Sequence, residues 1–167
     1  MFTISKRRAV IVLTAVSSLI FIASCKNKAD YQTPRKEVLE LHDKVMADGG
    51  KAENKEMQFD SLLKSGLKQL KLNQPALDTA AARTQINALN KQLGNADEQM
   101  ENWMHAYNND FKGRTEQETI DYFTAEKGKI SKVDSLYKDA LKSAGTYLKQ
   151  LKIKPDTSTH MDSKMKM

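Results

Sequence analysis

The sequence predicts an all-α protein: an antiparallel up-down-up bundle of three long helices that follows an N-terminal signal peptide. Apolar residues recur at steps of three and four through most of the chain, which is the period of an amphipathic helix. Only Pro34, Pro75 and Pro155 punctuate the chain, so long uninterrupted segments are allowed. We therefore expect a leader at 1–24, a linker at 25–33, a helical bundle at 34–152 and a disordered tail at 153–167.

The leader has the layout of an export signal. Basic residues at 6–8 precede an apolar run of about 15 residues, short of the roughly 20 that a helix needs to cross a bilayer. Ile22-Ala23-Ser24-Cys25 resembles the lipobox of bacterial lipoproteins, with a plain signal anchor as the alternative. The sequence thus predicts cleavage before Cys25, lipidation of this residue and stable attachment to a membrane.

The charge balance changes once the leader is removed. The leader holds three of the 27 basic residues and no acidic one, so the mature chain has about three more basic than acidic residues. These charges are interleaved along the chain, which is typical of solvated helical faces and argues against a nucleic-acid partner. The Lys-Asn-Lys run at 26–28 is neither acidic nor begins with Asp, so we expect an outer-membrane anchor that faces the periplasm.

The first helical segment opens at Thr33 and Pro34, which suit an N-cap and a first turn. Its apolar spacing is interrupted at Gly49 and Gly50, since each glycine costs a helix about 1 kcal/mol relative to alanine. The segment is therefore either one kinked helix that ends near residue 72, or two short helices that turn the bundle into a four-helix variant.

The second segment follows Pro75 and ends near residues 108–109, and the third begins at Thr115. Thr115 and Glu118 have the spacing of a capping box, and Pro155 lies beyond the end of the third segment. Acid-before-base pairs that we expect to point outward are Glu40/Lys44, Asp60/Lys64 and Asp134/Lys138. The second segment carries a heptad seam of Ile86, Leu89, Leu93, Ala96, Met100, Trp103 and Tyr107.

Four stretches carry a resemblance: LHDKVMA at 41–47, DEQMENWMHAY at 97–107, DFKG at 110–113 and KVDSLYKDAL at 132–141. Together they resemble an uncharacterised family of short bacterial lipoproteins, often labelled "viral A-type inclusion protein"-like. The resemblance covers most of the mature chain. It implies a helical lipoprotein and brings no catalytic residue with it.

Motifs of catalysis are absent from the sequence, so we expect a protein that is not an enzyme. It has no Gly-rich phosphate loop, no H-E-x-x-H, no G-x-S-x-G and no C-x-x-C. The di-iron sites of helical bundles need Glu three residues before His, and no histidine here has it. Glu101 and His105 lie one turn apart, which is more often a surface pair than a catalytic dyad.

Sulfur and imidazole form the one set of residues that could bind a metal. Thioethers and imidazoles suit Cu(I), so His42, Met46, Met100, Met104 and His105 are candidate ligands for a copper-handling protein. The simpler interpretation makes Met100 a core residue and His42 a polar residue at the edge of the core. Otherwise no cofactor is expected.

Trp103 and Tyr107 are candidates for binding a protein partner. Their place on the seam favours the core, and a helix face that the bundle leaves uncovered would make them part of a binding groove. The leading functional expectation is a membrane-anchored structural or interaction module that contacts another envelope protein. Copper handling is the alternative.

Overall fold

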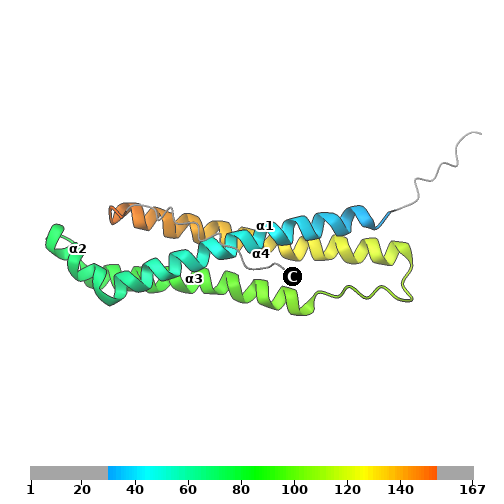
Figure 1. Cartoon of the computed structure of the whole chain (residues 1–167), viewed down its shortest axis with the longest axis horizontal. Helices are drawn as coiled ribbons and strands as arrows, with labels where there is room; N and C mark the ends of the chain where they lie inside the picture. The colour runs from blue at the N-terminus through cyan, green and yellow to red at the C-terminus, as the bar shows by residue number, and fades with distance from the viewer. Residues whose placement is uncertain (1–29, 154–167) are drawn as a thin grey trace, which may run out of the picture. The chain divides into compact units, whose positions relative to one another are not determined.

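The computed structural model describes residues 30–153, and they are all-α. The elements are α1 (Gln32–Ser61), a π-helical segment η1 (Leu62–Gly66), α2 (Leu67–Asn73), α3 (Thr79–Ala106) and α4 (Glu116–Gln150). The first three follow one another without a loop as one continuous helical rod, which bends near η1 so that α2 turns away from the line of α1 (Figure 1). α3 runs back along α1, and α4 returns. The predicted bundle of three long helices is confirmed. The leader, Cys25 and the tail from residue 154 lie outside the described residues.

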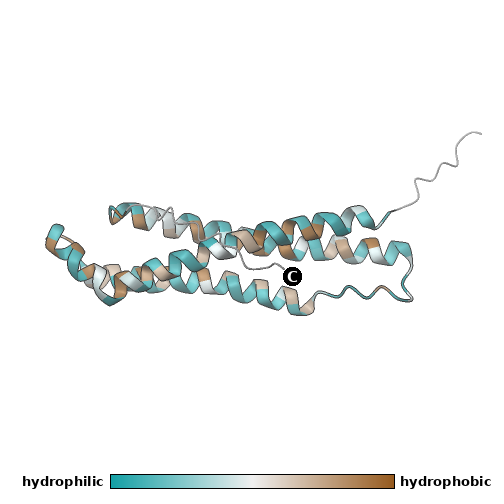
Figure 2. Ribbon diagram, viewed as in Figure 1, coloured by the Kyte–Doolittle hydropathy of each residue, from teal (hydrophilic) through white to brown (hydrophobic). Residues whose placement is uncertain are grey.

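The core lies along α4, which packs against both other rods. α1 and α3 each contact α4 more extensively than they contact each other. Polar and apolar residues alternate along every helix (Figure 2), as the sequence period requires. None of the helices in 30–153 combines the length and apolarity needed to cross a bilayer. The predicted seam is buried from Ile86 through Leu89, Leu93, Ala96 and Met100 to Trp103, with Tyr107 half-buried.

The helix ends follow local hydrogen bonding. The predicted capping box is present: Thr115 Oγ1 accepts from the Glu118 backbone at 3.2 Å, and a Glu118 carboxylate oxygen accepts from the Thr115 backbone at 2.8 Å. The second helix was expected to begin directly after Pro75, but α3 begins at Thr79. The Asp78 carboxylate caps it there by accepting from the backbone N–H of Ala80 at 2.9 Å. Those backbone bonds lower the pKa of Asp78.

The predicted N-cap at Thr33 is also wrong. α1 begins at Gln32 after Tyr31, and no side chain caps its first turn. Tyr31 packs against the Phe111 ring at 6.3 Å between centroids, so tertiary contact carries the helix past the expected start. Pro34 sits in the first turn, where its missing N–H is tolerated.

The break proposed at Gly49 and Gly50 does not occur, and the four-helix variant is wrong. α1 runs through both glycines without interruption. A Cβ built on Gly49 would lie 3.2 Å from the Tyr137 hydroxyl oxygen, whereas one on Gly50 would meet nothing within 4 Å. Close approach of α4 therefore explains Gly49, and tertiary packing outweighs its low helix propensity.

The one irregularity of the first rod lies farther along, at η1. The backbone N–H of Leu67 donates to the Leu62 carbonyl, five residues back. This wider turn brings Leu62 and Leu67 to the same buried side, although a spacing of five departs from the α-helical period. The rod thus keeps its apolar face toward the other helices beyond Phe59.

The prediction that Asp134 and Lys138 form an outward-pointing pair is wrong: the pair forms, but Asp134 is buried. Its carboxylate is buried and accepts from Lys138 at 2.5 Å and from Lys44 of α1 at 2.9 Å. Burial alone would raise the pKa of Asp134, but the hydrogen bonds and charges of the two lysines lower it overall. The Asp134 carboxylate therefore links α1 to α4. Lys44 pairs with Asp134 and not, as predicted, with Glu40.

The two glycines of α1 offer a matched test of this packing. Gly50→Ala should stabilise the bundle by roughly 0.5 to 1 kcal/mol through helix propensity, because its methyl group enters open space. Gly49→Ala should gain less, because the methyl group crowds Tyr137. In a Tyr137→Phe background, however, Gly49→Ala should recover the full gain.

The measurement is urea unfolding of the two alanine variants in both backgrounds, followed by circular dichroism. A coupling energy of about 0.5 kcal/mol or more is expected for Gly49 with Tyr137, and none for Gly50 with Tyr137. Additive effects at both glycines would contradict the close approach of Tyr137 to α1.

Candidate functional site

A groove opens between α1 and α3, on the side of the bundle where the helices contact each other least. Its volume is about 570 Å³. We call it the methionine groove. Its lining is Met46, Gly49, Gly50, Glu53 and Glu56 of α1, Asp97, Met100, Glu101 and Met104 of α3, and Tyr137 of α4.

Three methionine side chains line the methionine groove. Met46 is 45% exposed and Met104 is 42% exposed, whereas Met100 is only 2% exposed and forms part of the groove's base. Two of the sulfur side chains come from α3, one turn apart, and the third comes from the facing helix. The structure thus brings together three of the five residues predicted as metal ligands.

Four carboxylates share this groove and make it strongly acidic. Burial, followed by the charges of Asp97, Asp60 and Glu53, raises the pKa of Glu56. Within residues 30–153, neither Glu53, Glu56 nor Asp97 forms an ion pair with a lysine or arginine. The groove therefore has a negative potential that a bound cation would relieve.

Tyr137 holds the base of the groove in place. Its hydroxyl donates to an Asp97 carboxylate oxygen at 2.5 Å, which links α4 to α3 opposite Gly49 of α1. Burial, this hydrogen bond and the nearby charges of Asp97 and Glu56 raise the pKa of Tyr137. The phenol therefore stays protonated and acts as a fixed donor.

The two predicted histidine ligands lie outside the groove lining. The His42 ring is 5.8 Å from the Trp103 ring, and its Nδ1 is 3.0 Å from an Asp43 oxygen. His105 is exposed and pairs with Glu101 at 3.6 Å, as a surface pair would. In the described part of the chain, no three His, Cys, Asp or Glu side chains gather in a way that could hold a metal ion.

Trp103 and Tyr107 belong to an aromatic cluster at the end of the bundle where α1 begins. Trp103 is 6% exposed, and its ring lies 4.9 Å from that of Tyr107. The cluster continues through Tyr122 and Phe111, which the sequence did not single out. The structure places both predicted partner-binding residues within this packing, and Trp103 presents almost no free surface.

Buried polar groups accompany these aromatic rings. Glu126 is almost fully buried, and one of its oxygens accepts from Lys129 at 2.7 Å. Its second oxygen lacks a hydrogen-bond partner within 30–153, as do Arg35 Nε, Trp103 Nε1 and the Tyr107 hydroxyl. Such atoms carry a desolvation cost, so this end of the bundle is held by aromatic contact more than by hydrogen bonding.

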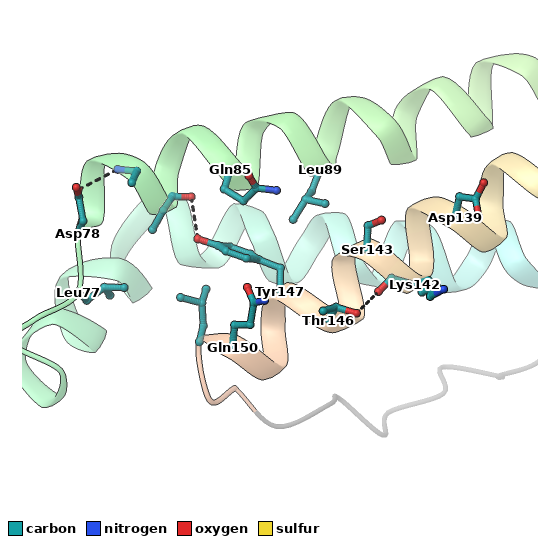
Figure 3. Close-up of a pocket in the computed structure, with 13 residues that line it drawn as sticks. Leu77, Asp78, Gln85, Leu89, Asp139, Lys142, Ser143, Thr146, Tyr147 and Gln150 are labelled. Atoms are coloured by element: carbon teal, nitrogen blue, oxygen red, sulfur yellow. Dashed lines mark hydrogen bonds between the residues drawn. The ribbon is translucent and has the colours of Figure 1, made fainter.

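A second groove, which we call the distal groove, lies between α3 and α4 at the opposite end of the bundle. Its volume is about 830 Å³. Figure 3 shows Tyr147 extending from α4 toward α3, where its hydroxyl donates to the Ala82 carbonyl at 3.5 Å. Burial raises the pKa of Tyr147. The lining is Leu77, Asp78, Ala81, Ala82, Gln85, Leu89, Asp139, Lys142, Ser143, Thr146, Tyr147, Gln150 and Leu151.

Small residues explain the distal groove. On the α3 side the lining includes Ala81 and Ala82, and on the α4 side it includes Ser143 and Thr146. Alanines cannot fill the space between two helices as the leucines and aromatic residues do elsewhere in the core. The polar side chains of the lining are mostly exposed, and the groove offers both apolar contact and hydrogen-bonding groups.

Comparison with protein-family models, with curated proteins and with solved structures found no match. The resemblance to short bacterial lipoproteins therefore stays a prediction.

The burial of Trp103 yields a direct prediction. Trp103→Ala should lower the free energy of unfolding by about 3 kcal/mol or more, because it removes a large side chain from packed surroundings. Met57→Ala, at an exposed position of α1, should cost less than about 0.5 kcal/mol. Urea unfolding measures both. A Trp103→Ala variant as stable as the parent protein would contradict the burial of Trp103 and would favour a role for this residue in binding a partner.

Proposed function

We propose that this chain is a lipid-anchored helical-bundle protein of the bacterial cell envelope that works by binding an envelope protein, without catalysis. The observation that supports the binding role best is the distal groove, an open site at one end of a closely packed bundle. The lipobox at Cys25 supports the anchor. Outer-membrane attachment facing the periplasm is part of the same proposal.

The arrangement suits an adaptor or spacer. α4 is 35 residues long, which corresponds to about 50 Å, and the distal groove lies at its C-terminal end. The chain enters the bundle at the other end, through Tyr31. A lipid attached to Cys25 would thus hold one end of the rod at the membrane and leave the groove free to meet a partner.

The lining of the distal groove indicates the chemistry of the partner. The half-buried Leu77 provides apolar contact beside the buried Leu89 and Leu151, and the lining also carries amides and hydroxyls of α3 and α4. The charged residues of the lining are Asp78, Asp139 and Lys142, two acidic residues and one basic residue. This mixture suits a protein segment with apolar anchors and hydrogen-bonding groups, and it is a poor surface for the phosphates of a nucleic acid.

Lipid attachment is tested at the cysteine. In cells fed radiolabelled palmitate, the parent protein should incorporate label and sediment with outer membranes, whereas Cys25→Ser should incorporate none. The mature parent protein should have the mass of a chain that begins at residue 25 plus its lipid. An unlabelled parent protein that keeps its leader would refute the anchor.

The docking role is tested by site-specific photocrosslinking in intact cells. A photoreactive residue at Gln85 or at Lys142, on opposite walls of the distal groove, should capture the same envelope protein. The matched controls are the exposed positions Lys91 of α3 and Lys132 of α4, which lie outside the groove and should capture nothing.

Ser143→Arg, which fills the groove, should abolish the adduct while leaving the helical content unchanged. Equal capture at the control positions, or capture that survives Ser143→Arg, would exclude the distal groove as the docking site.

A further inference from the structure

We propose that the methionine groove binds one Cu(I) ion through the sulfur atoms of Met46, Met100 and Met104. This site is separate from the distal groove, and it requires neither the lipid nor a partner protein. Met46 comes from α1, and Met100 and Met104 come from α3, where they lie one helical turn apart.

The exposure of two of the sulfur side chains argues against a purely structural role. Methionine in a bundle usually fills gaps in the core, as Met100 does. Met46 and Met104 instead stand half-exposed on the two helices that flank the groove. Leucine would serve helix formation equally well at these positions, so packing does not account for two thioethers that face one opening.

The ligand type selects the metal. Neutral thioethers are soft donors and favour Cu(I) over Zn²⁺, Mg²⁺ or Ca²⁺. The surrounding carboxylates favour a cation in general, and the thioethers decide which cation. Glu53, Glu56, Asp97 and Glu101 bring negative charge to the same groove. Burial, and then the charges of Asp97, Asp60 and Glu53, raises the pKa of Glu56.

The groove also has room beside the thioethers. Gly49 and Gly50 line it without side chains, and a Cβ on Gly50 would meet nothing within 4 Å. Tyr137 and Asp97 hold its base through their 2.5 Å hydrogen bond. An ion can therefore enter between the half-exposed Met46 and Met104, while Met100, the third methionine of the lining, is almost fully buried.

The test uses the mature protein in detergent under reducing, oxygen-free conditions, with Cu(I) competed against bicinchoninate. The protein should withdraw one equivalent of Cu(I) from the chelator. In a sample labelled at the methionine methyl groups, the resonances of Met46, Met100 and Met104 should shift on titration. The resonance of Met57, exposed on α1 and outside the groove, should stay in place.

Leucine replaces methionine without sulfur and with little change of volume. The triple variant Met46→Leu, Met100→Leu, Met104→Leu should lose about 100-fold in Cu(I) affinity and keep its helical circular dichroism. Met57→Leu should bind as the parent protein does. Glu53→Gln with Glu101→Gln should weaken binding by about tenfold or less, because these carboxylates support the site without ligating the ion.

Three results would overturn the proposal. The first is a triple variant that binds Cu(I) as tightly as the parent protein. The second is loss of binding that follows His42→Asn with His105→Asn, or leucine at the tail methionines Met161, Met165 and Met167. The third is displacement of Cu(I) by equimolar Zn²⁺ or Ca²⁺, which would make the groove a hard-cation site.

Discussion

The bundle depends on the packing of α4 against both neighbouring rods. α4 contacts α1 and α3 along its length, while those two meet each other far less. Tyr137 shows how closely the three come together, because it packs on Gly49 of α1 and donates to Asp97 of α3 from one position. The same arrangement leaves the α1–α3 side open above Tyr137. The methionine groove is thus a consequence of how the core is built.

Periodicity and capping were enough to predict the three rods. Steps of three and four locate the buried seam, and Thr115 with Glu118 marks the start of α4, because both signals are local. The break expected at Gly49 failed for the opposite reason, since the need for glycine there comes from Tyr137, 88 positions away in the chain. Asp134 was predicted to point outward for the same reason. Its burial depends on Lys44, which lies far away in the chain and donates to its carboxylate.

The candidate sites were less accessible to sequence reasoning. The spacing of Met100 and Met104 on one helix was visible, and so was the neighbouring His105, but which residue turns into the groove depends on the packing angle of α3 against α1. Trp103 could belong to a core or to a surface on spacing alone, and its ring contacts with Tyr107 and His42 decide between them. The distal groove had no sequence signal, because alanines mark an opening only once their helices face each other.

The two halves of α4 differ in the way they hold their neighbours, and this difference bears on function. Between its N-terminal part and its middle, α4 buries Glu126 and Asp134, and lysines reach both carboxylates from the surface. A buried pair such as Asp134 with Lys44 contributes little net stability but forms in one register only, so it fixes α1 against α4. Toward its C-terminus, the buried residues of α4 are Ala140, Ala144 and Leu148, none of them charged, and the distal groove lies between α4 and α3 there. A bundle fixed in register near its middle and open at one end can present a binding surface without changing its own fold.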